Sequence, residues 1–297
     1  QSAPEINELL QNYKNQLLSA THSLLLYFKF QKVMKIGVLK EEKIPVDKRV
    51  ALTPKQCSYL TKKYPSITVE VCSSDIRCFT DKMYRNEGVK VVHNLSNCDV
   101  LIGVKEVPIA SLIPNKIYFY FSHIIKKQNY NRALLLKMIE LNIKMVDYEV
   151  LKDLKGKRLL GFGRYAGIVG AYNGFLTYGL KSGNYTLKAA HKCENRLEME
   201  EEMSKIILSN EKIIVSGNGR VGQGIIEIMQ KSGIREVSKA IFINEIFDEA
   251  VYVHLNTMDY NVRRNGSQSH KQEFYNHPEL YCSSFMEYAK QADIFIA

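Results

Sequence analysis

The chain has 297 residues, of which 45% are hydrophobic and 24% are charged. These proportions are those of an ordinary globular protein, so they exclude a disordered chain, and the length indicates two domains rather than one core. The net charge of +10 would suit nucleic acid or a small anionic substrate. Because the basic residues are scattered and form no aromatic-basic motif, we expect a small-molecule substrate and no nucleic acid.

The cysteines indicate a reducing compartment. No two of them have CxxC spacing, and their irregular intervals disfavour both a disulfide framework and a structural metal site. Residues 1–33 do not have the form of a secretory signal. We therefore expect a cytoplasmic protein with free thiols and no metal. The six positions are Cys57, Cys72, Cys78, Cys98, Cys193 and Cys282.

Residues 1–33 differ in pattern from the rest of the chain, and we expect them to be an N-terminal extension outside the core. Residues 5–18 have the apolar spacing of a helix. Residues 23–30 are apolar, but this run is far shorter than the ~20 residues that a membrane span needs. The extension is either upstream sequence translated ahead of the natural start or, alternatively, a partner-binding helix.

Residues 34–161 are predicted to form a first domain with a parallel α/β sheet, because apolar runs alternate with helical segments. One predicted helix starts at Thr53, a capping residue, with Pro54 at the first helical position, and ends near residue 64. A second covers 129–141. The predicted strands are 35–39, 67–71, 89–92, 99–104, 117–121 and 143–146.

Charged side chains follow four of these segments, where the carboxyl ends of parallel strands meet and ligands bind. An arginine can hold a carboxylate through two hydrogen bonds. A histidine transfers protons near neutrality, and a lysine among other cations can act as a base. A glutamate beside them can orient either group. We therefore predict a site at this edge, formed by Arg49, Lys105, His123, Lys126 and Glu149.

The segment that joins the domains combines basic and small residues. We predict a strand at 159–162 and a helix from Arg164 onward, whose small residues recur at spacings of three and four. That spacing is typical of close helix packing, while Arg158 and Arg164 are candidate anion ligands. A further helix is predicted at 195–209.

Residues 162–297 are predicted to form a dinucleotide-binding domain. A strand at 213–215, a GxGxxG turn and an amphipathic helix follow one another, the order of the first βα unit of such folds. The turn keeps the backbone close to a pyrophosphate, and the helix N-terminus attracts the anion. The candidate cofactor residues are Gly217, Gly219, Arg220, Val221 and Gly222.

Two features of this domain leave questions open. The acidic residue expected ~20 positions into the fingerprint is replaced by Val237, with acidic and basic residues nearby. We therefore expect NAD as the cofactor but do not exclude NADP. The last segment, 289–297, ends on a predicted strand, so we expect the second domain to be truncated at its C-terminus.

Four stretches of this sequence resemble one superfamily. Residues 36–41 with 47–54 resemble the N-terminal signature of the alanine dehydrogenase, transhydrogenase and lysine-forming saccharopine dehydrogenase superfamily. Residues 104–108 resemble its lysine-bearing motif, and 120–123 resemble its histidine-bearing motif. Residues 156–158 and 162–167 resemble the saccharopine dehydrogenase branch.

The resemblance implies two Rossmann-like domains with the active site in the cleft between them, NAD and an amino-acid substrate. It implies that Lys105 and His123 form the acid–base pair, with Glu149 beside them. By the same resemblance, substrate carboxylates would bind near Arg49, Lys126 and Arg158. The pyrophosphate would bind at Gly217, Gly219 and Gly222.

The predicted function is that of an oxidoreductase acting on the CH–NH bond of an amino-acid derivative, as in lysine-forming saccharopine dehydrogenase. Hydride passes to the nicotinamide, and the resulting imine is hydrolysed. Two alternatives stay open: deamination of the alanine dehydrogenase type, and a truncated fragment that binds nucleotide without catalysis.

Overall fold

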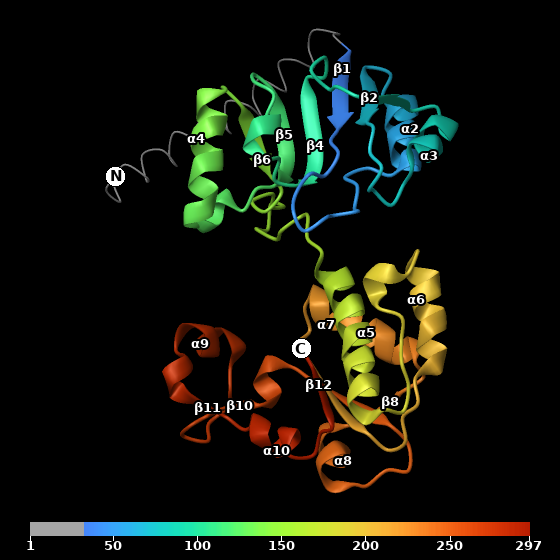
Figure 1. The fold of residues 1–297 in the computed structure, drawn as a ribbon. Coiled ribbons are helices and arrows are strands. Elements are labelled where there is room, and N and C mark those ends of the chain that lie inside the picture. The colour runs from blue at the N-terminus through green and yellow to red at the C-terminus, as the bar shows by residue number, and fades with distance from the viewer. Residues whose placement is uncertain (1–32) are drawn as a thin grey trace. The chain divides into compact units, whose positions relative to one another are not determined.

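A computed structural model describes residues 33–297 of the chain (Figure 1). The chain divides between Gly161 and Phe162 into two compact units, which are described separately below. The predicted N-terminal extension lies outside the described residues, apart from Val33. Among the described helices, none combines the length and the apolar character that crossing a membrane requires.

The first unit is built on a six-stranded sheet with the order β3-β2-β1-β4-β5-β6. All neighbouring strands are parallel. The order reverses between β1 and β4, and this is the strand order of a doubly wound dinucleotide-type fold, in which ligands bind at the carboxyl ends. The predicted α/β class is therefore confirmed. The strands are β1 (Met34–Val38), β2 (Ile67–Cys72), β3 (Lys90–Val92), β4 (Val100–Lys105), β5 (Ile117–Phe121) and β6 (Lys144–Asp147).

Helices cover both faces of this sheet, because alternate side chains of buried parallel strands enter different cores. One core contains Val38 and Val71 of the sheet with Tyr84; the other contains Tyr120 with Met138. The predicted helix start is confirmed, since the Thr53 side chain and Gln56 form a reciprocal capping box. The helices are α2 (Pro54–Lys63), α3 (Asp81–Asn86) and α4 (Arg132–Glu140), of which α3 was not predicted.

The second unit contains a four-stranded parallel sheet with the order β12-β7-β9-β8. Two further strands, β10 (Asn261–Arg263) and β11 (Tyr281–Ser283), form a separate antiparallel pair. Side chains of β7 alternate between two cores, with Ile213 and Val215 in one and Ile214 in the other. The sheet strands are β7 (Lys212–Ser216), β8 (Arg235–Glu236), β9 (Val251–Leu255) and β12 (Ile294–Ile296).

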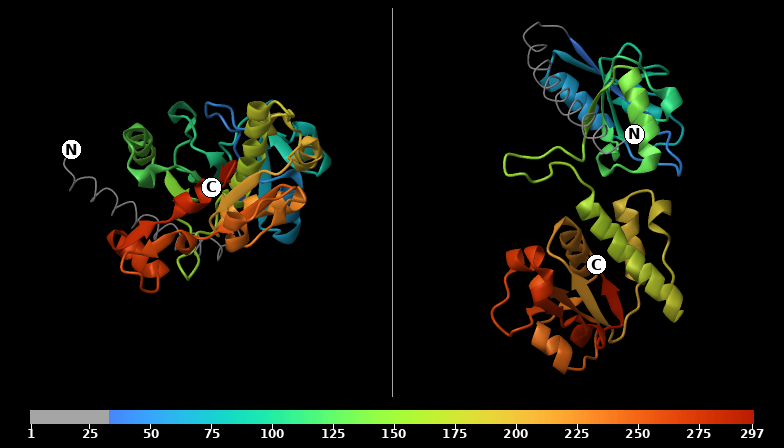
Figure 2. Two further views of the ribbon diagram at one scale, coloured as in Figure 1. Left: turned by 90° about the horizontal axis from the view of Figure 1, so that it is seen from below. Right: turned by 90° about the vertical axis from the view of Figure 1, so that its left-hand side faces the viewer.

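Two long helices of the second unit pack against each other at very short range. These are α5 (Gly163–Ser182), the long yellow-green helix in Figure 2, and α7 (Arg220–Lys231). A Cβ atom at Gly167 would lie 2.0 Å from the carbonyl oxygen of Val221, and one at Gly224 would lie 2.0 Å from that of Arg164. The small residues predicted on this helix therefore serve helix packing. The shorter helices are α6 (Arg196–Glu202), α8 (Lys239–Asn244), α9 (Lys271–Asn276) and α10 (Phe285–Ala289).

Two predicted elements are corrected by the structure. Residues 159–162 form a loop rather than a strand, and the helix predicted at 195–209 stops being helical after Lys205. The guanidinium of Arg164, a candidate anion ligand, donates to both carboxylate oxygens of Glu227 at 2.8 and 2.9 Å. This ion pair joins α5 to α7.

Candidate active site

Three predicted site residues lie on neighbouring strand ends of the first unit. Lys105 is the last residue of β4, and His123 and Glu149 follow β5 and β6 by two residues each. Since β5 lies between β4 and β6 in the sheet, the histidine is placed between the lysine and the glutamate. The parallel topology therefore brings together residues that are up to 44 positions apart in the chain (149 − 105 = 44).

The three side chains form a continuous hydrogen-bonded line. Nδ1 of His123 lies 3.0 Å from Oε2 of Glu149, and Nζ of Lys105 lies 3.4 Å from Nε2 of His123. A carboxylate accepts, so Nδ1 carries a proton and donates to Glu149. Nε2 can then accept from the lysine ammonium or donate to a neutral lysine. This arrangement can pass a proton along its length.

A fourth predicted residue, Lys126, is tied to the same glutamate. Its Nζ lies 3.3 Å from Oε1 of Glu149. Burial alone would raise the pKa of the Glu149 carboxyl, but the hydrogen bonds and positive charges of His123 and Lys126 hold that pKa below its usual value. Glu149 is therefore an ionised anchor for both the histidine and the lysine.

Buried polar residues that the sequence did not assign to the site hold these loops in place. The Ser122 hydroxyl donates to Oδ2 of Asp147, and Oδ1 of Asp147 accepts the Glu149 amide at 2.8 Å. The Asn131 side-chain amide donates to the His123 carbonyl at 3.2 Å, and His123 itself has a left-handed backbone with φ of 57°. A Ser or Asp that directly follows a buried strand is the sequence signal for such supports.

Arg49 belongs to a second charged group near the same edge. Its guanidinium donates to both carboxylate oxygens of Asp47, with Nε at 2.8 Å from Oδ1. The hydrogen bond from Arg49 is the largest cause that lowers the pKa of Asp47, and the charge of Lys105 contributes to the same effect. Arg49 thus approaches any substrate as part of a pair, because Asp47 already engages its guanidinium.

Two acidic residues beside Lys105 were not predicted to belong to the site. Glu106 pairs with Lys43 through Oε1, while its buried Oε2 has no hydrogen-bond partner among the described residues. Glu41 is 7% exposed and accepts the backbone amides of Val104 at 2.7 Å and of Lys105 at 2.9 Å. The backbone of Lys105 therefore lies beside two carboxylates, those of Glu41 and Glu106.

Arg158, the remaining predicted substrate ligand, lies on an exposed loop of the first unit. It forms an antiparallel bridge with Lys152, and a turn closes between them because the Asp153 carboxylate accepts the amides of Lys155 and Lys157. Arg158 thus belongs to a hairpin-like loop, unlike the Lys105–His123–Glu149 line at the strand ends.

The glycine loop of the second unit follows the carboxyl end of β7 and leads into α7. Gly217 has φ of +93°, which favours glycine, and a Cβ at Gly222 would lie 2.0 Å from the Gly217 carbonyl oxygen. At Gly219, the residue that precedes α7, a Cβ would meet nothing within 4 Å. The loop is therefore tightly packed between Gly217 and Gly222, while the space next to Gly219 is free of other atoms of the described chain. A pyrophosphate would fit in this space, against the backbone amides at the start of a 12-residue helix. Arg220 and Val221 occupy the first turn of that helix.

The strands on either side of β7 are β12 and β9, and β9 rather than β8 is the neighbour whose carboxyl end could face the ribose of a dinucleotide. An acid near Val237 would follow β8, which is an outer strand of this sheet. The carboxyl end of β9 leads to Asn256 and Asp259, and Oδ2 of Asp259 accepts the Asn256 amide at 2.7 Å. Oδ1 of Asp259 accepts from Lys239 at 2.5 Å. His254 on β9 also donates from Nε2 to the Gly217 carbonyl at 2.8 Å.

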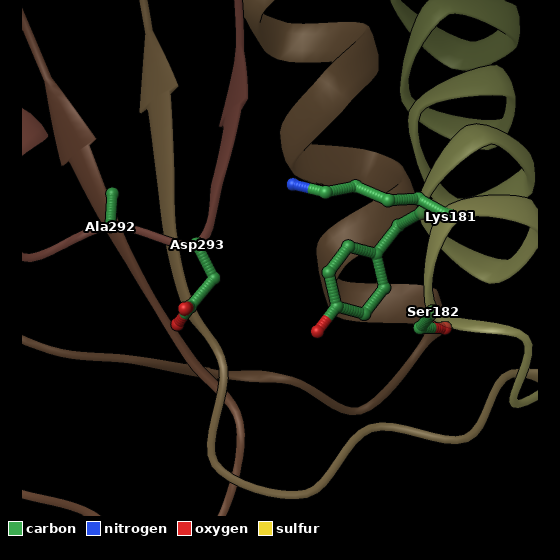
Figure 3. Close-up of a pocket in the computed structure, with 5 residues that line it drawn as sticks. Lys181, Ser182, Ala292 and Asp293 are labelled. Atoms are coloured by element: carbon green, nitrogen blue, oxygen red, sulfur yellow. The ribbon is translucent and has the colours of Figure 1, made fainter.

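A pocket of about 350 Å³ lies at the other end of the second sheet (Figure 3). Lys181 and Ser182 come from the end of α5, and Asp293 precedes β12 and accepts the Lys212 amide at 2.9 Å. In Figure 3 the Lys181 side chain extends across the opening. Because β7 runs from Lys212 to Ser216, this pocket is at the amino edge of the sheet and does not belong to the glycine loop.

All six cysteines are free thiols. Within residues 33–297, His, Cys, Asp and Glu side chains form no group of three or more suited to hold a metal ion. Burial raises the pKa of the Cys98 thiol to about 11 and that of the Cys57 thiol to about 12. These thiols are therefore packing residues rather than reactive nucleophiles.

Comparisons with known proteins define the class of this chain. Residues 37–169 match the family "Alanine dehydrogenase/PNT, N-terminal domain". Mitochondrial alpha-aminoadipic semialdehyde synthase of Mus musculus is 26% identical over 265 residues, covering 80% of this chain and 28% of that protein. The NAD(+)-dependent, L-lysine-forming saccharopine dehydrogenase of Yarrowia lipolytica is 28% identical over 214 residues, covering 67% of this chain and 58% of that protein.

A solved L-alanine dehydrogenase shares the fold, with a TM-score of 0.52, 17% identity, and coverage of 76% of this chain and 62% of that one. Residues 37–169 therefore resemble the N-terminal domain of alanine dehydrogenase and transhydrogenase, and the solved structure shows the fold alone. In sequence the chain is similar to alpha-aminoadipic semialdehyde synthase and to lysine-forming saccharopine dehydrogenase. It spans only 28% of the length of the mouse relative and 58% of that of the Yarrowia relative.

Proposed function

We propose that this chain carries out nicotinamide-dependent oxidation of the CH–NH bond of an amino-acid derivative, with saccharopine as substrate. The line from Lys105 through His123 to Glu149, at 3.4 and 3.0 Å, is the observation that carries this proposal. It provides a base, a proton shuttle and an anchoring carboxylate on one sheet edge. Amine oxidation followed by imine hydrolysis needs that set of groups.

The residues act in sequence on the substrate. Lys105 removes a proton from the secondary ammonium, so that its lone pair assists the loss of hydride from the adjacent carbon. NAD supplies the hydride acceptor when bound. His123 then takes a proton from the water that adds to the imine carbon. It returns this proton to the amine nitrogen, and the neutral imidazole then takes the hydroxyl proton as the carbinolamine collapses to lysine and 2-oxoglutarate. General acid–base steps of this kind contribute ~10²–10⁴ in rate each.

The substrate carboxylates are the remaining charges to be placed. Lys126 and Arg49 stand on the same edge as the proton relay, and we assign them to carboxylate binding together with Arg158. Lys126 is already neutralised by Glu149 and Arg49 by Asp47. Each cation therefore binds a substrate carboxylate while it is still paired with its own acidic partner. This pairing lowers the affinity for the carboxylate and favours release of the product.

We propose NAD rather than NADP as the cofactor, and the proposal is supported by the charges at the carboxyl end of β9. There the carboxylate of Asp259 pairs with Lys239, so the positive charge that would attract a 2′-phosphate is already neutralised. Arg235 is one of the basic residues near Val237 that could attract a 2′-phosphate, but it pairs with Glu249 next to the amino end of β9. The pyrophosphate would bind at Gly217, Gly219, Arg220, Val221 and Gly222.

The test is a substrate panel on the purified chain. Saccharopine, alanine and other amino acids are offered with NAD or NADP, and reduced nicotinamide is followed by absorbance. Turnover of saccharopine with NAD is expected. Turnover of alanine alone would replace the proposed substrate with that of the alanine dehydrogenase type, and cofactor binding without any turnover would support a non-catalytic nucleotide-binding protein. A cytoplasmic location is part of the proposal and is tested by fractionation, since the mouse relative is named as mitochondrial.

A further inference from the structure

The end of β4 departs from regular strand geometry just before Lys105. Pairing between β4 and β5 shifts register between Ile102 and Lys105. On the other side, pairing with β1 ends where the Leu39 amide donates to the Ile102 carbonyl at 2.9 Å. Lys105 pairs again with Phe121 of β5 beyond the shift, but the amides of Val104 and Lys105 donate to a side chain rather than to the strand ladder. A buried amide needs such an acceptor, because an unpaired one is costly.

A single buried carboxylate takes over as that partner. Oε1 of Glu41 accepts the Val104 amide at 2.7 Å, and Oε2 accepts the Lys105 amide at 2.9 Å. In a regular strand these consecutive amides would point to opposite neighbours. Here the irregularity turns both toward β1, where the chain continues into Glu41. Such a bulge re-aims the side chain that follows it.

The space for this carboxylate is made by a glycine. A Cβ at Gly103 would lie 3.3 Å from Oε1 of Glu41 and 3.2 Å from a methyl carbon of Leu39. Both distances are shorter than ordinary van der Waals contact, so an alanine would push against the carboxylate. The Glu41 carboxylate thus packs directly against Gly103, two residues before Lys105.

Glu41 also stands among the other charges of this edge. Burial raises the pKa of Glu41, while the two amides and the charge of Arg49 act in the opposite direction and that of Asp47 adds to the rise. The charge of Glu41 also affects a neighbouring group. Burial, and after it the negative charge of Glu41, raise the pKa of the Tyr148 hydroxyl to about 12. Because both Glu41 oxygens accept amide hydrogens, the ionised form is the one that this geometry fits.

We propose that Glu41 is a positioning residue for Lys105: its carboxylate holds the bulged end of β4 and thereby keeps the lysine amine against His123. The inference rests on the proposed function for the role of Lys105 as the base. Glu41 itself touches backbone amides, and its effect reaches the chemistry through the direction of the lysine side chain.

The test compares Glu41→Gln with Glu42→Gln in the full chain. The neighbouring Glu42 undergoes the same change but forms a surface ion pair with Lys40 at 3.0 Å, so it is the matched control. A glutamine can accept one amide but presents its own NH₂ to the other. Glu41→Gln is expected to lower kcat by about 10–100-fold, the scale of a misplacement of ~1 Å. The KM for the cofactor should change by less than about twofold, since the glycine loop is on the other unit.

The pH–rate profile separates positioning from loss of fold. In Glu41→Gln the acidic limb of kcat should move to lower pH, because removing a negative charge near the lysine favours the neutral amine. Glu41→Asp should recover part of kcat, since it keeps the charge but reaches one amide less well. Wild-type kcat and an unmoved profile in a Glu41→Gln protein that melts as the wild type does would overturn the proposal.

Two further measurements keep the test decisive. If Glu41→Gln does not fold, Gly103→Ala replaces it, and about a tenfold loss of kcat is expected from the displaced carboxylate. The labelling rate of the Lys105 amine with an amine-directed reagent, read by peptide mass spectrometry, needs no turnover. It should rise about threefold or more in both variants as the amine leaves His123, on the same scale of displacement. An unchanged labelling rate would overturn the positioning role of Glu41, even if the chain does not turn over saccharopine. If saccharopine is turned over while labelling is unchanged, the proposed function stands and the positioning role does not.

Discussion

The strand-end residues of the first unit and the glycine loop of the second solve opposite problems. In the first, the side chains of Lys105, His123 and Glu149 follow one another at 3.4 and 3.0 Å. In the second, the important feature is the absence of side chains, because a Cβ at Gly222 would occupy the position of a backbone carbonyl. One region offers proton-transfer groups and the other offers shape and backbone amides.

This difference predicts different failures. A side-chain relay should lose its chemistry when one atom type is replaced, while its fold remains, because hydrogen-bonded loops such as those at Ser122 and Asp147 hold the backbone independently. A loop whose function depends on its backbone should lose its conformation when a Cβ atom is added at a packed glycine, and the adjoining helix should be displaced as well. Paired variants in the two regions test whether the two kinds of failure are distinct.

The largest effect is expected at Gly222. In Gly222→Ala the new Cβ would lie 2.0 Å from the Gly217 carbonyl oxygen, so the loop or α7 must move. We expect the second unit to lose about 3 kcal/mol or more of unfolding free energy and the chain to lose dinucleotide binding. Thermal unfolding and titration with NADH measure the two losses.

Gly219→Ala is the matched control, since its Cβ would meet no atom of the chain within 4 Å. It should melt as the wild type does yet bind NADH more weakly, because the Cβ projects into the space for the pyrophosphate. Normal NADH binding by Gly222→Ala would show that the loop is not the cofactor site.

The relay should behave in the opposite way at His123. His123→Gln keeps the approximate size of the side chain but cannot take and return a proton, so kcat should fall by about 10²–10⁴-fold. Unfolding and NADH binding should remain as in the wild type. His277→Gln is the control, because His277 also approaches a glutamate, Glu279 at 3.2 Å, on an exposed surface. Equal kcat in the two variants would remove His123 from the mechanism.

The sequence predicted the first unit more completely than the second. Six strands were expected and found within one residue at each end, because buried parallel strands are short apolar runs bounded by polar residues. The relay was predicted for the same reason, since strand ends of one sheet share an edge. The apolar run 159–162 was misread as a strand, because a short apolar run does not say whether it has a strand to pair with.

Two residues show what the sequence could not provide. Counting along the chain leads to Val237, after β8, as the position of a ribose ligand. In the sheet β8 does not pair with β7, whose neighbours are β12 and β9, and this spatial order cannot be counted off along the sequence. Glu41 is the last residue of the segment 36–41, and nothing in that segment indicates what its carboxylate contacts. Its two amide partners are 63 and 64 residues away, and no local pattern reports a contact at that separation.

A smaller effect is expected from the acidic anchor of the relay. The folded pKa of Glu149 is held below its usual value, so its pairing stabilises the fold fully above the unfolded pKa of ~4.3. That contribution is lost as pH falls through the lower folded pKa. Glu149→Gln should therefore be less stable than the wild type by about 1 kcal/mol near neutrality, and the two should converge in acid. Urea unfolding at several pH values measures the difference.

Glu140→Gln is the comparison for this measurement, because Glu140 pairs with Lys137 at 2.5 Å on an exposed helix surface. Its difference from the wild type should be close to zero at every pH. A constant gap between Glu149→Gln and the wild type down to the acid transition would show that the ion pair is not what stabilises these loops.

The smallest effect concerns which cofactor the glycine loop receives. Asp259→Asn removes the carboxylate that neutralises Lys239, so the freed ammonium should attract a 2′-phosphate and the ratio of NAD to NADP affinity should fall about 3–5-fold, the scale of an exposed ion pair. Glu249→Gln is the control, since it frees Arg235 from a similar pair at 2.6 Å beside the amino end of β9. Fluorescence titration with NADH and NADPH measures both ratios. An equal change in the two variants would mean that net charge alone sets the preference, whereas a change confined to Asp259→Asn would place the ribose at the carboxyl end of β9, beside the glycine loop.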